Sequence, residues 1–250
     1  MPFFRQTMIE FYVYPLLSLL FVAIFTREVI APASKNTCDR RWLIWSLALA
    51  ASTLLTTLIT GYIFGQSIRQ TALFPTAGKL SDGAVGVLSF LINSFIFYWW
   101  HRATHASDFL WRHFHQLHHS ARRVESLTAF YAHPLETAAA VLIGAFSSYC
   151  ILGASPLAAA IALLITGIFD LFLHSDIRTP RWLGYFLQRP EMHTVHHQSG
   201  HHRQNYGLPV WDLLFGTWVN PEQRVETLGF DEKRSEQITE MLMFQDVYKH

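Results

Sequence analysis

The stretch LSFLINSFIFYWWHRATH, residues 88–105, joins an apolar segment directly to two histidines. His101 and His105 are four residues apart, a spacing that places both side chains on the same face of a helix. The aromatic residues 98–100 stand immediately before them, and aromatic side chains are typical of the boundary between a membrane and water. We therefore predict a helix that enters the membrane and carries its histidine pair just outside the bilayer.

Two further histidine clusters have a related spacing. HQLHH (residues 115–119) and HTVHH (193–197) each place histidines at positions i, i+3 and i+4, on one face of a helix. Neutral imidazole binds iron, copper, zinc and nickel. Eight imidazoles are too many for one metal ion, so we expect two metal ions, each held by four or five histidines with positions left open for water or dioxygen. The clusters contain no acidic residue, and the predicted site is nearly all nitrogen.

The composition is that of a membrane protein. Hydrophobic residues make up 51% of the 250 residues and charged residues 15%, against about 25% charged residues in an ordinary soluble domain. The net charge of +1 gives no reason to expect a nucleic-acid partner. The two cysteines form neither a disulfide framework nor a CxxC pair, and we expect Cys150 to act as a small apolar residue. The N-terminus lacks the pattern of a signal peptide.

Five apolar runs are candidates for entering a bilayer. They are Ile9–Thr26, Trp42–Gly65, Ala84–Trp100, Thr137–Ala154 and Leu157–Leu173. Only the second clearly exceeds the roughly 20 residues of a spanning helix, and the other four either span a thin region or form hairpins that dip into the bilayer. The tight turn at 153–156 makes the last two runs an antiparallel pair.

We predict one domain over residues 1–250: an all-α, integral-membrane helical bundle with a histidine-rich, cytosolic metal-binding cap. The last segment, 219–250, is polar, and we expect a solvated peripheral helix capped by Ser235. Arginine and lysine concentrate after the first and third apolar runs, on the side that carries the histidines, so the positive-inside rule makes that side cytoplasmic and the N-terminus external. A compact chain without an endoplasmic-reticulum retention ending favours a bacterial inner membrane.

The sequence contains none of four motifs that mark other kinds of catalytic or nucleotide-binding site. The chain has no HExxH, GxSxG, Walker or GxGxxG sequence. A zinc hydrolase needs a carboxylate base beside its metal, which the clusters do not provide. Among the remaining histidines, His113 points away from His115 on a helix and is expected not to be a ligand. His201 and His202 follow the third cluster in a polar turn, and we expect either surface residues or a pair outside the ligand set.

The order of the three clusters among apolar runs resembles the fatty acid hydroxylase/sterol desaturase family of integral-membrane di-iron oxygenases. Three supporting motifs are AHPLE (132–136), LHSD (173–176) and NYG…WDLLFGTW (205–218). The resemblance covers residues 88–218, about half of the chain, and its motif set is highly specific. It implies a four-helix-type membrane bundle with a cytosolic cap, two iron ions, and O₂-dependent attack on an unactivated C–H bond of a lipid.

The resemblance also assigns metal ligands. The cluster histidines and His174 match ligand positions of the family, and His133 matches a histidine that is either a ligand or a support for one. The implied metal site contains His101, His105, His115, His118, His119, His133, His174, His193, His196 and His197. Asp176 stands where the family often has asparagine, and its carboxylate is expected to bind iron, to orient a ligand imidazole or to cap a helix. Trp211, Asp212 and Phe215 are expected to pack the cap, with no catalytic residue beyond the ligands.

By this resemblance we expect a hydroxylase that uses a di-iron centre and O₂ on a membrane lipid. A desaturase with the same centre is the first alternative, since the clusters do not separate the two reactions. The second alternative is a membrane protein that holds zinc or copper without turnover. The chain has no recognisable haem-binding or flavin-binding segment, so the electrons are expected from a separate carrier such as a ferredoxin or a cytochrome b5-like protein.

Overall fold

The computed structural model describes residues 2–34, 39–68, 72–76 and 79–248. These residues form helices and connecting segments, with no β-strand among them and one isolated bridge between Gln198 and Leu228. The longer helices are α1 (Pro2–Ile30), α2 (Arg40–Ile68), α3 (Asp82–Ala106), α6 (Pro134–Ala145) and α7 (Pro156–Leu173). The predicted all-α fold is confirmed.

Among the described residues, five segments are long and apolar enough to cross a membrane, and each coincides with one predicted apolar run apart from a few end residues. α6 reaches this length only together with the π-helix η3 (Phe146–Ile151) that continues it. α1 and α3 have 29 and 25 residues, longer than the apolar runs, because the polar residues at their ends are helical too. The chain is therefore a multi-pass membrane protein with five candidate spans, one more than the four-helix type.

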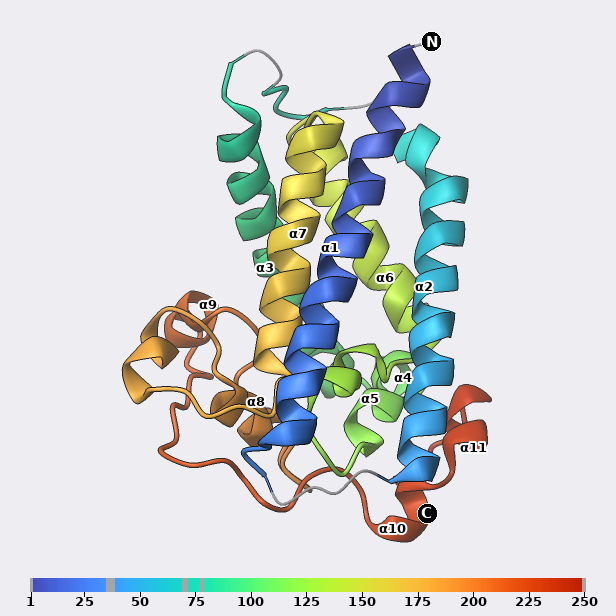
Figure 1. Cartoon of the computed structure of the whole chain (residues 1–250), viewed down its shortest axis with the longest axis vertical. Helices are drawn as coiled ribbons and strands as arrows, with labels where there is room; N and C mark the ends of the chain where they lie inside the picture. The colour runs from blue at the N-terminus through green and yellow to red at the C-terminus, as the bar shows by residue number, and fades with distance from the viewer. Residues whose placement is uncertain (1, 35–38, 69–71, 77–78, 249–250) are drawn as a thin grey trace.

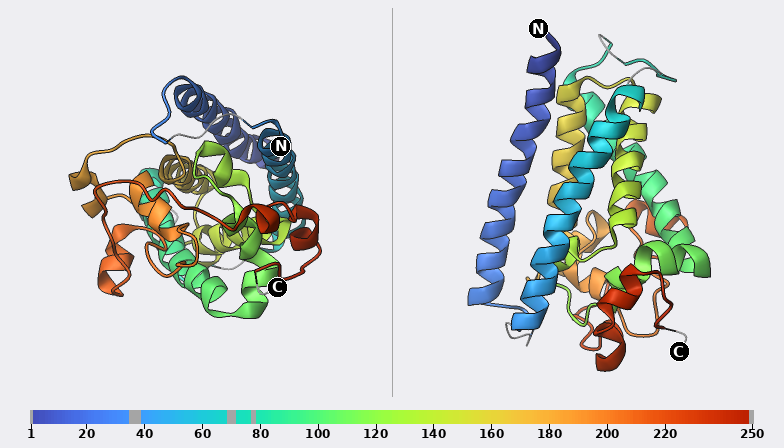
Figure 2. Two further views of the ribbon diagram at one scale, coloured as in Figure 1. Left: turned by 90° about the horizontal axis from the view of Figure 1, so that it is seen from below. Right: turned by 90° about the vertical axis from the view of Figure 1, so that its right-hand side faces the viewer.

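Small residues let the two helices α3 and α7 approach closely (Figure 1). A Cβ atom on Gly86 of α3 would lie 2.6 Å from Cγ2 of Ile161 and 2.9 Å from the carbonyl oxygen of Ala158. Close approach gives membrane helices the dispersion contacts that hold them together, because lipid provides no hydrophobic drive between them. α7 also packs against α1, which lies at the outside of the bundle, while α2 packs against α6 (Figure 2).

The chain reverses between η3 and α7 at the predicted turn. Gly153 has a φ of +59°, in the left-handed region that glycine adopts without strain. Ser155 caps α7 by accepting the N–H of Ala158. Pro156 takes the first helical position, where no N–H is needed. The antiparallel pair thus follows from local backbone preferences.

Short helices gather at one end of the bundle and form a cap (Figures 1 and 2). They are α4 (Asp108–Leu110), η1 (Trp111–His115), α5 (Gln116–Ser120), η2 (Ser126–Phe130), η4 (Arg181–Tyr185), α8 (Pro190–His196), α9 (Pro209–Leu214), α10 (Glu232–Ser235) and α11 (Ile238–Leu242). The cap brings the segments after α3 and after α7 together, and with them all three histidine clusters.

The C-terminal tail is packed into the cap, in contrast to the solvated peripheral helix expected from its polar composition. Ile238 and Met241 of α11 are 4% and 0% exposed and lie in one apolar cluster with Leu117 of α5. Asp231, and not Ser235, caps α10. The polar average composition of the tail gave no sign that these few apolar side chains pack in one cluster with Leu117 of α5.

Replacing Met241 with alanine should lower the free energy of unfolding by about 2–5 kcal/mol, because it leaves a cavity under α5. The exposed Met243 is the matched control, and Met243→Ala should change the free energy of unfolding by less than about 0.5 kcal/mol. Thermal unfolding of the purified protein in detergent measures both. Equal stabilities of the two variants would show that α11 does not pack on the cap.

Candidate metal centre

Each histidine cluster enters the cap from a different element. His101 and His105 lie in the last turns of α3, and His115 ends the π-helix η1. The third cluster lies on α8 and its C-cap, and His174 is the C-cap of α7. The wider hydrogen-bonding pattern of a π-helix is frequent at functional sites, where it shifts the direction of the side chains that follow.

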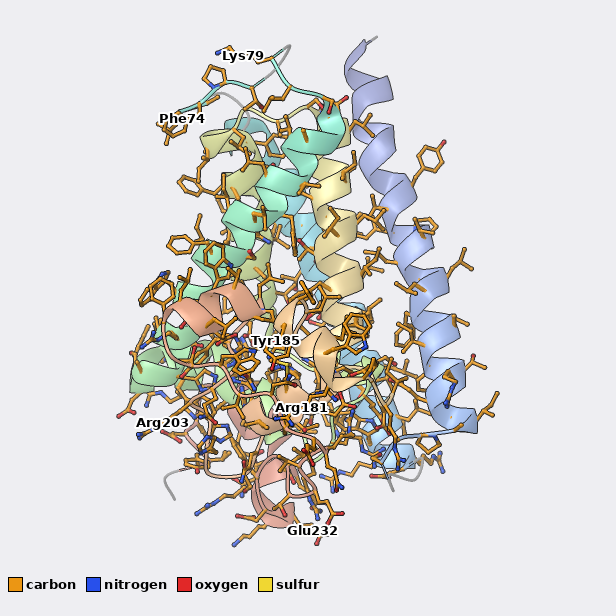
Figure 3. The ribbon with its side chains drawn as sticks, turned by 90° about the vertical axis from the view of Figure 1, so that its left-hand side faces the viewer. Phe74, Lys79, Arg181, Tyr185, Arg203 and Glu232 are labelled. Carbon is orange, nitrogen blue, oxygen red and sulfur yellow. The ribbon has the colours of Figure 1, made fainter. Side chains whose placement is uncertain are left out.

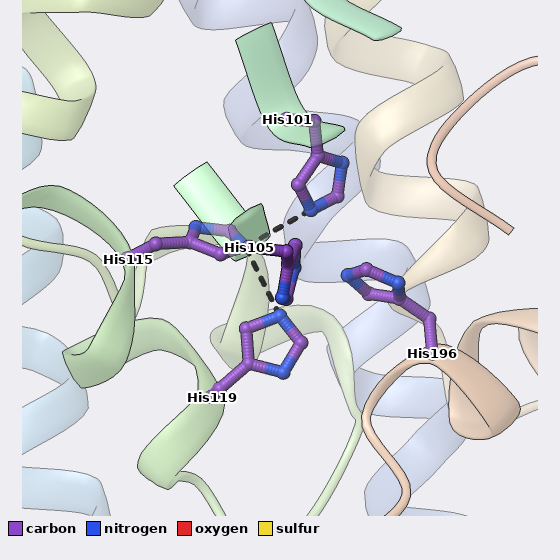
Figure 4. Close-up of side chains that lie close together, drawn as sticks. All are labelled: His101, His105, His115, His119 and His196. Atoms are coloured by element: carbon purple, nitrogen blue, oxygen red, sulfur yellow. Dashed lines mark hydrogen bonds between the residues drawn. The ribbon is translucent and has the colours of Figure 1, made fainter. Parts of the chain in front are cut away.

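The structure collects nine of the ten predicted ligands into two groups. The five-histidine group consists of His101, His105, His115, His119 and His196, whose rings point toward a common centre (Figure 4). The four-histidine group consists of His118, His174, His193 and His197. Within each group, one ring nitrogen of every histidine lies within 4.8 Å of the others, and all the side chains are buried except the partly buried His105.

Helical spacing explains how one cluster serves both groups. His115 and His119, at i and i+4, belong to the five-histidine group, while His118, at i+3, belongs to the four-histidine group. In the third cluster the two groups exchange places. His193 and His197, at i and i+4, belong to the four-histidine group, and His196, at i+3, belongs to the five-histidine group. Positions i+3 and i+4 lie about 100° apart around a helix, so neighbouring residues face two adjacent sites.

Several Nε2 atoms within each group lie at contact distance from one another. Nε2 of His115 is 2.9 Å from Nε2 of His101 and 3.0 Å from Nε2 of His119. The four-histidine group repeats this around His193, whose Nε2 has two such neighbours at 2.9 and 3.1 Å. A ring nitrogen carries either one lone pair or one proton in the plane of the ring. A hydrogen bond therefore accounts for only one of the two contacts that Nε2 of His115, or Nε2 of His193, makes.

Hydrogen bonds at the opposite ring nitrogen determine the tautomer. Nδ1 of His101 donates to the carbonyl oxygen of Tyr206 at 2.7 Å. His118, His174 and His196 donate in the same way to backbone carbonyl oxygens at 3.2, 2.9 and 2.7 Å. Because a carbonyl oxygen only accepts, Nδ1 carries the proton in these rings and Nε2 is left with a lone pair.

Glu136 of α6 orients His115 by accepting the proton of its Nδ1, and the carboxylate is buried. The Nε2 atoms of His115 and His101 therefore both carry lone pairs and lie 2.9 Å apart, which is repulsive unless one cation accepts both lone pairs. A carboxylate behind a metal-bound imidazole fixes the ring and strengthens it as a donor. The donor set thus fits a metal ion in the five-histidine group.

Burial keeps the cap histidines neutral. Loss of hydration, with smaller effects of neighbouring imidazoles, lowers the pKa of His115 and of His118 to about 3. The same causes lower the pKa values of His119 and of the three histidines in 193–197 well below their ordinary range. Neutral imidazole is the form that binds metal, so these residues need not lose a proton at neutral pH to act as ligands.

His133 lies outside both groups. Its Nδ1 accepts the N–H of Leu135 as the N-cap of α6, and its Nε2 faces the carbonyl oxygen of Leu242 at 3.3 Å. With both nitrogens engaged, His133 ties α6 to the tail. Instead of His133, it is Glu136 of the same AHPLE motif that contacts a grouped histidine, His115. The sequence analysis assigned no role to Glu136. The available signal was an acidic residue at the start of an apolar helix.

The other histidines divide as follows. His113 lies outside the groups, as expected, and its Nδ1 donates to the carbonyl oxygen of Phe109 at 2.7 Å. His201 contacts a neighbouring glutamine at 2.9 Å. His202 turns inward, and its ring centroid lies 4.7 Å from that of His119. His202 therefore borders the five-histidine group without belonging to it.

Asp176 binds backbone and hydroxyl groups near the end of α1. Its carboxylate accepts the N–H of Ser34 at 3.0 Å and the hydroxyl of Ser34 at 2.6 Å, and it lies 3.5 Å from Arg224. The N–H of Asp176 donates to Glu28, which also accepts the N–H of Ser126. Asp176 belongs to neither histidine group and performs none of the three expected roles, which were to bind iron, to orient an imidazole or to cap a helix. Its contacts instead join the end of α1 to the cap.

Comparison with known proteins points to the same residues. A family model described as fatty acid hydroxylase matches residues 86–217, slightly more than half of the chain. This range contains both histidine groups and Glu136. No solved structure matches the chain significantly.

Three similar proteins illustrate the range of relatives. Sphinganine C4-monooxygenase 2 of Arabidopsis thaliana is 25% identical over 233 residues, which are 86% of this chain and 88% of that protein. Ornithine lipid hydroxylase OlsE of Rhizobium tropici is 34% identical over 147 residues, 56% of this chain and 44% of that protein. Very-long-chain aldehyde decarbonylase GL1-9 of Oryza sativa subsp. indica is 30% identical over 129 residues, 48% of each protein.

The match thus extends over most of the first relative and over less than half of the other two. The relatives differ in substrate and, for the decarbonylase, in reaction, so similarity alone does not fix the activity. The family model itself covers the histidine clusters and the motifs between them, in the order in which the sequence analysis found them. The chain therefore belongs to the fatty acid hydroxylase family.

Proposed function

We propose that this protein hydroxylates an unactivated C–H bond of a membrane lipid with O₂ at a centre of two iron ions. The observation that carries the proposal is the pair of adjacent groups of buried, neutral histidines at one end of a membrane bundle. The relatives named for hydroxylation of sphinganine and of an ornithine lipid support the same reaction class. We assign the nine grouped histidines as ligands and leave His133 out.

Four of the five Nε2–Nε2 contacts within the groups favour a coordination number above four, and the fifth, between His118 and His174, measures 3.4 Å. Metal–nitrogen bonds of about 2.1 Å that meet at right angles place neighbouring nitrogens about 3.0 Å apart, whereas the tetrahedral angle places them about 3.4 Å apart. The contacts around His115 and His193 measure between 2.9 and 3.1 Å. They fit six coordination, in which groups of five and four histidines would leave one and two positions for O₂.

Iron bound here would supply the redox chemistry that activates O₂ toward a C–H bond, and the residues of the chain have other tasks. Their Nδ1–H groups, bonded to backbone carbonyl oxygens, hold the rings in fixed orientations. The carboxylate of Glu136 makes His115 a stronger donor. Burial excludes bulk water from both groups, so that water does not compete with the lipid.

The position of the groups supports a lipid substrate. Both groups include histidines from the cap-side ends of α3 or α7, the two candidate spans that pack against each other. A separate carrier, such as a ferredoxin or a cytochrome b5-like protein, would bring electrons from the aqueous side. We propose that this side is cytoplasmic, as the arginine distribution favours, and that the membrane is a bacterial inner membrane.

Lipid mass spectrometry tests the reaction in cells that express the intact chain, His118→Ala or His113→Ala under oxygen. The intact chain and the His113→Ala control should each produce a lipid class heavier by one oxygen atom. The amount of this product should fall at least about tenfold with His118→Ala, because the four-histidine group loses a nitrogen donor. Added cytochrome b5 or ferredoxin with its reductase ensures electron supply.

Two other outcomes would contradict hydroxylation. A lipid class lighter by two hydrogens would assign a desaturase, the alternative that uses the same centre. Metal-loaded protein that converts no lipid of its native membrane, with a competent electron donor present, would assign a metal-binding protein without turnover.

Replacing Glu136 with glutamine should weaken metal binding by about 10–100-fold, because a neutral amide no longer strengthens His115 as a donor. Competition between the purified protein and a chelator of known affinity measures this change. Glu232→Gln, on the exposed helix α10, is the matched control and should bind metal as the intact chain does. An unchanged affinity of Glu136→Gln would remove this carboxylate from the metal site.

A further inference from the structure

The cap exposes large apolar side chains on two segments outside the five candidate spans. The eight residues are 37–71% exposed, and they are Trp182, Tyr185, Phe186, Leu187, Val210, Leu213, Leu214 and Phe215. The two segments, η4 with its continuation to residue 187 and α9 with Phe215, contact each other. We call these eight side chains the η4–α9 surface. Contiguous apolar surface of this kind is rare on proteins surrounded by water.

The two segments that form this surface contain few charged residues. Residues 182–187 contain no charged residue, and residues 209–215 contain only Asp212. Asp212 is buried, where it accepts the N–H of Tyr206 at 2.9 Å and the hydroxyl of Thr217 at 2.6 Å. α9 thus turns its polar residue inward and its apolar residues outward. A helix in water has the opposite arrangement, so an apolar surrounding is implied.

The η4–α9 surface continues the outer side of α3. Phe95 and Trp99, within the span of α3, are themselves 37% and 42% exposed. Trp211 packs against Phe95 with ring centroids 5.0 Å apart, and Phe215 packs against Trp99 at 4.8 Å. Figure 1 shows α9 beside the lower part of α3. The same lipid that surrounds α3 therefore reaches α9.

Charged residues of the cap lie farther from the membrane. In Figure 3, Tyr185 lies nearer to the spanning helices than Arg181 and Arg203, and Glu232 lies at the far end of the cap. Arg181 pairs with Glu222 at 3.1 Å, and Arg203 and Glu232 are exposed. Aromatic residues at the level of the lipid headgroups, with arginines just outside them, are typical of a membrane interface.

We propose that the η4–α9 surface is a membrane anchor, inserted into the leaflet on the cap side without crossing the bilayer. The occupant is the bilayer itself, because the surface is continuous with the lipid-facing side of α3. Interfacial helices bury their apolar face about 5–10 Å below the headgroup boundary, a depth that side chains of this size reach. The anchor is a property of the cap in the membrane and does not depend on the proposed reaction.

The anchor is also connected to the metal centre. The rings of Phe215 and Tyr98 stack at 5.4 Å, and Tyr98 meets Tyr206 at 5.9 Å. The ring of Tyr206 lies 5.5 Å from the rings of both His101 and His196. These packed aromatic rings set the depth of the five-histidine group relative to the leaflet.

Spin labels test the anchor in the complete chain. Phe186→Cys and Leu214→Cys, each in a chain whose two native cysteines are serine, are labelled with a nitroxide and placed in nanodiscs of phosphatidylcholine and phosphatidylglycerol. Leu58→Cys, on an exposed position of the α2 span, is the lipid reference. Glu232→Cys is the water reference. All four positions are exposed, so the substitutions leave the packing intact.

Labels at 186 and 214 should collide with O₂ in preference to a water-soluble nickel chelate. Their ratio of the two collision rates should match position 58 and exceed that of position 232 by on the order of tenfold. Nickel accessibility equal to position 232 would mean that water or a soluble partner meets the surface, and it would overturn the anchor. Low accessibility to both reagents would mean that protein, such as a second copy of the chain, covers it, with the same consequence.

Discussion

Each histidine group buries neutral imidazoles whose Nε2 lone pairs converge on one small space. Facing lone pairs repel, and buried polar atoms without partners cost free energy. A cation in each group removes both penalties. Such a cation would hold together histidines from segments far apart in the chain, so we expect metal binding to contribute to the folding of the cap.

Elements outside the histidine clusters support the centre through a few polar or packed contacts each. Glu136 of α6 orients His115, and α11 packs on α5, the helix that carries the second cluster. Glu28, at the end of α1, binds the N–H groups of Ser126 and Asp176 in two cap loops. The membrane helices therefore do more than hold the protein in the bilayer, since their ends position the loops that present the ligands.

Sequence reasoning identified helices and grouped histidines well because both depend on local spacing. A histidine at i+4 shares a helix face whatever surrounds it, and nine of the ten predicted histidines lie in the two groups. Long-range partners have no such local signal. The contact of Glu136 with His115 joins different elements, the burial of Met241 depends on α5, and the outward face of α9 is visible only once Asp212 is seen to turn inward.

X-ray absorption at the iron edge tests the central claim most directly, on protein purified and loaded with ferrous iron in nanodiscs. We expect a shell of five or six donors, mainly nitrogen, at about 2.1–2.2 Å, together with the outer scattering of imidazole rings. Iron surrounded mainly by oxygen or sulfur would contradict it. So would a protein that rejects iron and holds only four-coordinate zinc, because the histidine groups would then belong to a structural site.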